Sequence, residues 1–301
     1  MIRKTAICAL LCASAAQTAA ADETATALGL NTIAAAQTLS ASVQGMLRHN
    51  CEIALGNSRA TEALTDDIES YHAMIALLRD GGEGDWIAPV RSPLAQHALE
   101  RLEAESETTI AFAQVGLSGS VDPAYLEHLY PARDRSLAAA EDVAAILSET
   151  FMLRRLGLLE STTFDALSDI VAATHSIAGD ACMVTVGASV DAARADLFVT
   201  LDTVVQTVAL LRTGDAMAKI LPPDASSAAA IACVAGEVDA VAAQLDTWRD
   251  GQPDTAAYEG LVIALDGLHA NASQAVEVFA AGIMGQGGAE PACIVSTTPE
   301  S

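Results

Sequence analysis

Apolar residues return every three to four positions along most of this chain, and strict alternation of the kind seen in β-strands is rare. Alanine, leucine and glutamate, which favour helices, are abundant. The pattern predicts an all-α protein. Glycine, proline and short polar clusters divide it into eight expected helices, at about 24–57, 59–80, 92–117, 123–156, 162–187, 189–213, 225–250 and 254–284. Thr162, with Asp165 three residues later, resembles a capping box at the start of the fifth.

The second half of the chain repeats the first. Cys51–Gly56 returns as Cys182–Gly187 after 131 residues, and Leu77–Gly81 returns as Leu210–Gly214 after 133. A period this long indicates two copies of a small domain. Four amphipathic helices per copy, joined by short loops, predict two tandem up-down-up-down four-helix bundles. We expect a signal peptide at 1–21, bundles at 22–157 and 158–285, and a C-terminal tail at 286–301.

The first residues have the features of a secretory leader. Arg3 and Lys4 precede an apolar run, and small residues follow it up to Asp22. This order predicts a signal peptide cleaved near Ala21, with a retained N-terminal anchor as the alternative. The run is too short to span a bilayer as a mature helix. We therefore expect a periplasmic or secreted protein whose mature chain does not insert into the membrane.

The chain is strongly acidic, with 39 Asp and Glu against 15 Lys and Arg. Such a charge repels nucleic acid and anionic lipid, so neither is an expected partner. The acids are scattered without a metal-ligand spacing, and the histidines show no HExxH pattern. No catalytic constellation or cofactor motif can be assembled. We expect neither an enzyme nor a cofactor-binding or metal-binding protein.

Four cysteines remain after the expected cleavage, which in an oxidising compartment predicts two disulfides. An up-down bundle places Cys182 and Cys233 at opposite ends, about 15–20 Å apart, beyond the roughly 7 Å between α-carbons that a disulfide allows. Cys233 is therefore expected to pair with Cys293, and Cys51 with Cys182 across the axis that relates the two copies. The alternative for Cys51 and Cys182 is two separately buried thiols.

The order of these motifs is similar to that of the PilJ-type domain. The matching residues are Cys51–Gly56, Leu77–Gly81, Ile87–Pro89 and Val121–Pro123, and in the second copy Cys182–Gly187, Leu210–Gly214 and Ile220–Pro222. This domain is the N-terminal sensor module of type IV pili chemotaxis transducers, and it resembles the nitrate-sensing domains of NarX-like kinases. The resemblance implies an exported sensory or ligand-binding protein without an output domain.

The resemblance also implies a ligand region on the first helix, where the nitrate sensors place an anion-binding arginine. The corresponding stretches here, 37–45 and 171–177, contain no arginine, so we do not expect nitrate-type binding. The ligand-binding candidates are Gln44, Arg48, His49 and His175. The alternative for Arg48 and His49 is a surface or inter-bundle polar contact, and for His175 it is packing.

We therefore expect the protein to bind a small solute, or a membrane receptor or sensor protein, between its bundles. The alternative is a structural or protein-interaction module whose ligand site has decayed. A filled inter-helix space at His175 and Gln44 would favour that alternative.

Overall fold

The computed structural model describes residues 3–82, 87–152, 157–285 and 291–294, and of 3–27 and 151–152 only the helical path. These residues form eight α-helices, one short 3-10 helix and no β-strand, which confirms the all-α prediction. The helices are α1 (Arg3–Ala54), α2 (Ala60–Asp80), α3 (Pro93–Gly116), α4 (Pro123–Met152), α5 (Leu158–Val186), α6 (Val190–Thr213), α7 (Ala225–Leu245), η1 (Asp246–Trp248) and α8 (Thr255–Ile283).

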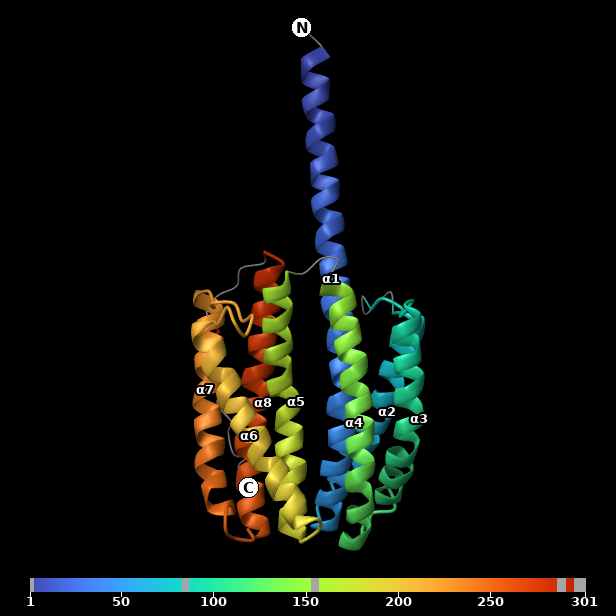
Figure 1. The fold of residues 1–301 in the computed structure, drawn as a ribbon, viewed down its shortest axis with the longest axis vertical. Coiled ribbons are helices and arrows are strands. Elements are labelled where there is room, and N and C mark those ends of the chain that lie inside the picture. The colour runs from blue at the N-terminus through green and yellow to red at the C-terminus, as the bar shows by residue number, and fades with distance from the viewer. Residues whose placement is uncertain (1–2, 83–86, 153–156, 286–290, 295–301) are drawn as a thin grey trace.

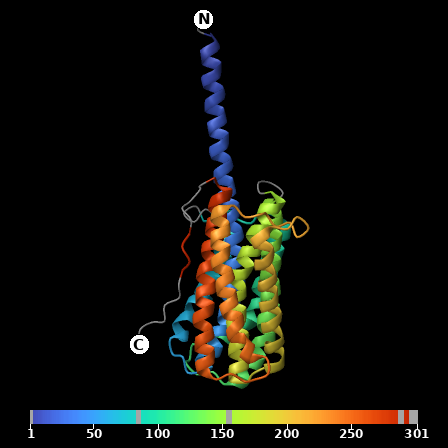
Figure 2. The same cartoon turned by 90° about the vertical axis from the view of Figure 1, so that its left-hand side faces the viewer.

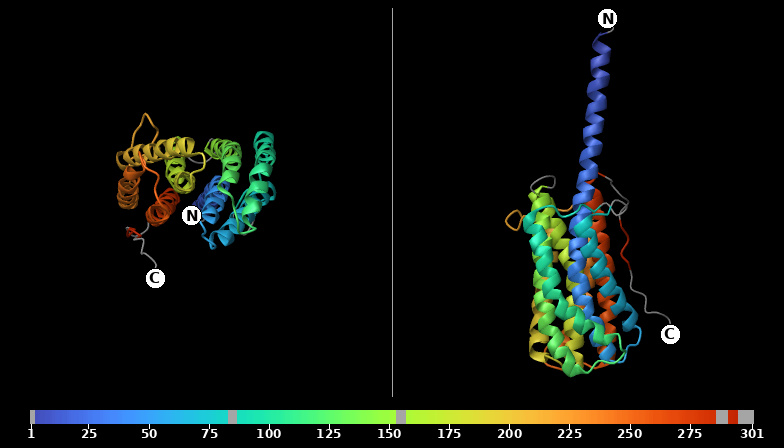
Figure 3. Two further views of the ribbon diagram at one scale, coloured as in Figure 1. Left: turned by 90° about the horizontal axis from the view of Figure 1, so that it is seen from below. Right: turned by 90° about the vertical axis from the view of Figure 1, so that its right-hand side faces the viewer.

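The helices group into two four-helix bundles that lie side by side (Figures 1 and 3). In the first, α1 packs against α2 and α4, and α3 closes the ring; in the second, α5 packs against α6 and α8, and α7 closes it. The predicted tandem up-down-up-down arrangement is therefore confirmed. The bundles meet chiefly along α1 and α5, with a smaller contact between α4 and α5. Their apolar side chains form one continuous buried cluster.

Several helix ends differ from the expected ones. The helix α1 begins at Arg3 and not near residue 24, so it continues through the expected leader and extends beyond the bundles (Figures 1 and 2). The helix α4 ends at Met152, and the remainder of its expected range, 153–156, lies outside the described residues. Cleavage near Ala21 and the boundary at 157/158 stay predictions.

The expected capping box at the start of α5 is wrong. The helix begins at Leu158, one turn earlier. The hydroxyl of Thr162 donates to the Leu158 carbonyl at 2.8 Å, as a side chain inside a helix does, and Asp165 accepts from Ser148 on α4 at 2.7 Å. The carboxylate therefore faces the neighbouring bundle, which places Asp165 where the two bundles meet.

The internal repeat is visible in the loops that follow α2 and α6. Gly81 and Gly214 end these helices with φ angles of +83° and +71°, a region that residues with a Cβ rarely adopt. A Cβ added at either would lie 2.8 Å from Pro89 or 2.5 Å from Pro222. The Leu-Leu-Arg-x-Gly and Ile-x-Pro motifs thus form the same loop in both copies.

A buried threonine anchors each of these loops. Thr32 accepts a hydrogen bond from the Ala88 backbone at 2.9 Å, and Thr163 accepts one from Leu221 at the same distance. The two threonines are 131 residues apart, the offset of the cysteine motif. Sequence reasoning missed this pair, because a threonine inside a helix carries no local sign of a distant partner.

The contact between α1 and α5 is close and covalently linked. Cys51 and Cys182 form a disulfide with 6.0 Å between their α-carbons, and both are fully buried. Gly179 lies about one turn before Cys182 on α5 and faces Leu47 and the backbone of Arg48 on α1. A Cβ added at Gly179 would lie 3.6 Å from the Leu47 side chain, an ordinary contact distance. The predicted link between equivalent positions of the two copies is therefore confirmed.

The second predicted disulfide is also present, between Cys233 on α7 and Cys293, with 5.2 Å between α-carbons. Beside it, the Asn271 side chain on α8 donates to the Ile294 carbonyl at 2.8 Å and accepts from its N–H at 2.9 Å. Residues 291–294 are therefore held against the second bundle. The rest of the expected tail, 286–290 and 295–301, lies outside the described residues.

One described helical segment, Ala225–Trp248, is long and apolar enough to cross a membrane by length and composition. In the fold it forms one wall of the second bundle, where it packs against α6 and α8. Its apolar character is thus matched by a partner within the protein.

The disulfide between the bundles predicts a measurable stabilisation. Replacing both Cys51 and Cys182 with alanine should lower the free energy of unfolding by about 2–5 kcal/mol, because it opens a 131-residue loop in the unfolded chain. Urea unfolding under oxidising conditions measures the effect. The Cys233→Ala/Cys293→Ala variant, which opens a 60-residue loop, is the comparison and should lose slightly less. An unchanged urea midpoint in the first variant would contradict the prediction.

Candidate functional site

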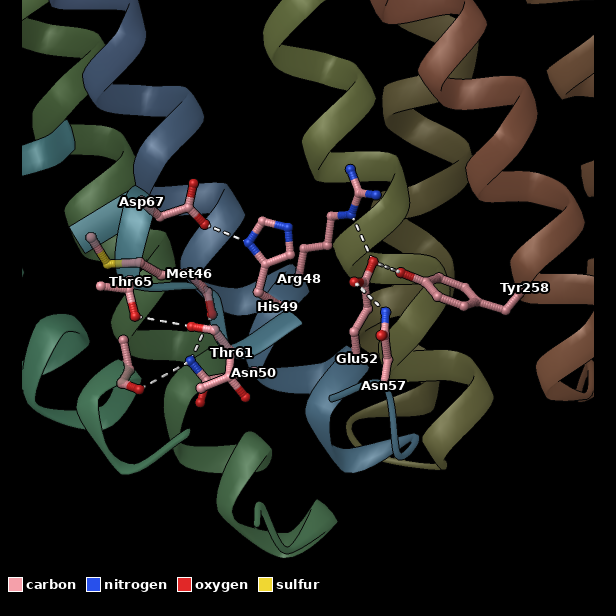
Figure 4. A network of polar contacts seen from close by, with 11 residues as sticks. Met46, Arg48, His49, Asn50, Glu52, Asn57, Thr61, Thr65, Asp67 and Tyr258 are labelled. Atoms are coloured by element: carbon pink, nitrogen blue, oxygen red, sulfur yellow. Dashed lines mark hydrogen bonds and ion pairs between the residues drawn. The ribbon is translucent and has the colours of Figure 1, made fainter. Parts of the chain in front are cut away.

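Arg48 is bound into a network that joins the two bundles (Figure 4). Its Nε lies 2.8 Å from Glu52 one turn later on α1, and a terminal nitrogen lies 3.8 Å from Asp266 on α8. The hydroxyl of Tyr258, also on α8, donates to one carboxylate oxygen of Glu52 at 2.8 Å. The Asn57 side chain donates to the other Glu52 oxygen at 3.4 Å. The guanidinium is therefore matched by acids, which leaves it poorly suited to hold an added anion.

His49 points the other way, into the first bundle (Figure 4). Its Nδ1 lies 2.6 Å from the Asp67 carboxylate on α2. The approach depends on Gly45, because a Cβ there would lie 2.4 Å from the same carboxylate. His49 thus makes a contact within the first bundle, and it does not converge with Arg48 on one site.

His175 lies at the α5–α8 contact and packs edge-to-face on His269, with 5.0 Å between ring centres. Its Nδ1 is buried and has no hydrogen-bond partner. Burial lowers its pKa to about 3, and the nearby positive groups of Arg48, His269 and His49 act in the same direction. The ring is therefore neutral at physiological pH and serves as a packing group.

A second polar network joins the bundles on the α4 side. Asp180 on α5 is fully buried and accepts from Arg133 at 3.2 Å and from Tyr130 at 3.0 Å, both on α4. Tyr130 also donates to Asp196 on α6 at 2.8 Å. Each side of the α1–α5 contact is thus closed by a tyrosine, an arginine and an acid. Arg133 and Asp266 occupy equivalent positions in the repeat, at the offset of 133, but the two tyrosines do not.

Gln44 lines a pocket between α1, α4 and α5, which we call the α1–α4–α5 pocket. Its volume is about 240 Å³. Three carboxylates line it: Glu141 from α4, and Asp165 and Asp169 from α5. Its apolar walls are alanines, and its lining contains no Arg, Lys or His.

A pocket of about 500 Å³ lies on the other side of the α1–α5 contact, between α1, α5 and α8. We call it the α1–α5–α8 pocket. The repeat offset of 131 relates the α5 wall of one pocket to the α1 wall of the other. Asp165 and Asp169 of the α1–α4–α5 pocket therefore correspond to Ala34 and Thr38 of the α1–α5–α8 pocket. The pockets are therefore equivalent in the repeat, but only the α1–α4–α5 pocket has aspartates at these two positions. In the α1–α5–α8 pocket the charged or titratable lining groups are Glu277 and His269.

The three carboxylates of the α1–α4–α5 pocket all have raised pKa values. Desolvation by the surrounding residues raises the pKa of Asp169 to about 6, and the negative charges of Asp165 and Glu141 contribute to this increase. Burial raises the pKa of Asp165, although the Ser148 hydroxyl partly offsets this. Burial raises the pKa of Glu141, and the negative charge of Asp142 raises it further. Glu141 and Asp169 nevertheless keep contact with solvent at the rim, so the pocket is open to a solute.

Gln44 is the other unusual group of this pocket. Its side chain is only 5% exposed, and its Oε1 is buried without a hydrogen-bond partner. An unsatisfied buried acceptor costs about 1–3 kcal/mol. A donor that reached Gln44 from the pocket would remove this cost.

The structure therefore separates the four predicted ligand residues. Gln44 lines the α1–α4–α5 pocket, Arg48 and His49 make ion pairs in opposite directions, and His175 belongs to the lining of neither inter-bundle pocket. Sequence reasoning missed the three acids. Asp165 and Asp169 stand four residues apart on one helix face, but only the fold brings α4 beside that face.

Comparison of the chain with protein-family models, with curated proteins and with solved structures finds no match. The PilJ-type resemblance therefore stays a prediction carried by the motifs themselves.

The unsatisfied amide predicts that Gln44 reduces stability. Without added solute, the Gln44→Leu variant should be more stable than the natural protein by about 1 kcal/mol, because leucine has a similar size and leaves no acceptor unpaired. Thermal and urea unfolding measure the difference. Gln206→Leu, at an exposed position of α6, is the control and should change stability by less than about 0.5 kcal/mol. A loss of stability in Gln44→Leu would show that the amide has a partner.

The neutral state of His175 predicts a pH effect. The unfolded chain binds a proton near pH 6.5, whereas the folded chain does so only near pH 3, so His175 makes stability fall as pH decreases between these values. His175→Gln should reduce that loss, by up to about 1.4 kcal/mol per pH unit. Urea unfolding at pH 7, 5.5 and 4 tests this. His97→Gln, on the exposed face of α3, should follow the natural protein, and parallel profiles for His175→Gln would contradict the prediction.

Proposed function

We propose that this protein is an exported, non-catalytic binding module that holds a small solute between its two bundles, in the α1–α4–α5 pocket. The observation that carries the proposal is an open pocket between the bundles that is lined by Gln44, whose amide oxygen is buried and has no hydrogen-bond partner. Interiors of purely structural interfaces are filled at near-crystalline density. A pocket with a few convergent polar groups is the usual form of a ligand site.

The size of the pocket sets the scale of the solute. Its volume of about 240 Å³ lies below the roughly 300–1,000 Å³ typical of sites for drug-sized molecules. The solute is therefore small, with the dimensions of a metabolite of a few carbon atoms. It contacts both bundles at once, so its binding favours one packing of α4 and α5 against α1.

Two disulfides fit an oxidising environment. Together with the expected leader they support a periplasmic or secreted location. The PilJ-type resemblance adds a role: a membrane receptor or sensor protein would read the loaded state. The acid-paired Arg48 and His49 support a ligand other than the nitrate-type anion of that family.

Native mass spectrometry of protein purified from the compartment to which it is exported tests the proposal. We expect a retained mass of a few hundred daltons or less, bound once per chain. In Ala145→Leu, which narrows the α1–α4–α5 pocket, the retained mass should be lost. Ala111→Leu, at an exposed position of α3, should retain it. A bare chain in every preparation, with no stabilisation by any solute in a thermal-shift screen, would favour the structural alternative.

A further inference from the structure

We infer that the α1–α4–α5 pocket takes a short protonated aliphatic amine, whose ammonium group lies among the carboxylates of Glu141, Asp165 and Asp169. This inference rests on the proposed function, since it names the chemical class of the solute. It is carried by the chemistry of the lining, by the unpartnered amide of Gln44, and by the contrast with the equivalent pocket on the other side of α1 and α5.

The charged groups of the pocket are acids without a positive counterpart. Among the described residues, neither Glu141 nor Asp169 forms an ion pair or a hydrogen bond through its side chain, and Asp165 accepts only from the Ser148 hydroxyl. Elsewhere on the same bundles acids do find arginines, as Glu103 does with Arg79. Three neighbouring carboxylates repel one another, and a bound cation would relieve that repulsion.

Gln44 adds a further acceptor. Its Oε1 lacks a donor, and its side chain, only 5% exposed, belongs to the lining of the pocket. An ammonium group carries three N–H donors and no acceptor. It can therefore satisfy two carboxylates and the Gln44 carbonyl at the same time, which a neutral or anionic head group cannot.

The repeat supplies an internal comparison. The α1–α5–α8 pocket has the same position in the duplicated fold, but alanine and threonine stand where the α1–α4–α5 pocket has Asp165 and Asp169, and Glu277 there is accompanied by His269. The concentration of acids is thus a property of one pocket and does not follow from the acidity of the whole chain.

An organic cation fits these acids better than a metal ion. No group of three or more His, Cys, Asp or Glu side chains in the described part of the chain is arranged to hold a metal. Divalent cations need several oxygens within about 2.0–2.6 Å of one point, whereas an ammonium group donates hydrogen bonds of about 2.8 Å in separate directions. The alanine walls, Ala144, Ala145 and Ala172, suit the methylene groups of an aliphatic amine.

The test uses three probes that share a four-carbon chain: 1,4-diaminobutane, 1,4-butanediol and succinate. Isothermal titration calorimetry of the purified full chain, at pH 7.5 and about 0.15 M salt to screen surface attraction, should show one 1,4-diaminobutane bound per chain. The diol and the dicarboxylate should show no binding. Magnesium, calcium and manganese chlorides, titrated in the same way, should neither bind in the pocket nor displace the amine.

Variants locate the site. Asp169→Asn and Glu141→Gln should each weaken binding of 1,4-diaminobutane by about tenfold or more, the scale of one hydrogen bond to a charged group. Gln44→Leu should weaken it similarly. Asp202→Asn removes an exposed carboxylate of α6 far from the pocket and is the matched control, with unchanged affinity. Circular dichroism and urea unfolding check that each variant folds, and two acids on different helices keep the test valid if one variant does not.

A pH series gives an independent readout. The charged groups that face Asp169 are Glu141 on α4 and Asp165 on its own helix, while α1 presents Gln37, Ser40 and Gln44, which carry no charge. The pKa of Asp169 is raised to about 6, so affinity for the amine should fall as the pH is lowered from 7.5 to 5 and this carboxylate takes up a proton.

The outcomes separate the two proposals. Binding of the diol or succinate that is lost in Gln44→Leu, without binding of the amine, overturns the amine and leaves the proposed function standing. A divalent cation that binds more tightly than the amine also overturns it. If 1,4-diaminobutane binds every variant with equal strength, it is attracted only to the acidic surface of the protein. That result also overturns the inferred amine site. No binding of any probe, together with a bare chain in native mass spectrometry, overturns both.

Discussion

The close contact of α1 and α5 is the constraint on which the rest of the molecule depends. Cys51 and Cys182 are linked there, and Gly179, about one turn before Cys182, faces Leu47 on α1. The inter-bundle pockets lie about two to five helical turns from the disulfide, where α4 and α8 complete the walls. The disulfide thus joins equivalent positions of the two copies, and the same α1–α5 contact carries a pocket on each side.

Buried charge determines which ligands such an interface can accept. The arginines that reach it are already matched, Arg48 by Glu52 and Arg133 by Asp180. Breaking a buried ion pair is strongly unfavourable, because it leaves the remaining charge without a partner. These arginines therefore act as parts of the framework. The unmatched charges that line the α1–α4–α5 pocket are carboxylates, so the electrostatic field of the pocket is negative.

The local sequence predicted most of the secondary structure and the pairing of the halves. The apolar period, the Gly81 and Gly214 turns and the repeat of the cysteine motif were sufficient for two four-helix bundles and for both disulfides. Short-range signals were less reliable at helix ends. Thr162 and Asp165 have the spacing of a capping box, but α5 begins one turn earlier and Asp165 bonds to α4 instead. Asp165 is therefore used in a contact between the bundles and not in a local cap.

By itself, then, the sequence determined the helical class, the duplication and the cysteine pairing, because hydrophobic period and repeat spacing act along the chain and need no knowledge of neighbours. The tertiary structure alone decided the site. It turned His49 into the first bundle, packed His175 on His269, left Gln44 beside a pocket, and brought Glu141 from α4 next to the acids of α5. Which side chains meet across two bundles depends on the rotation of each helix about its axis, and that rotation is set by the packing of all eight together.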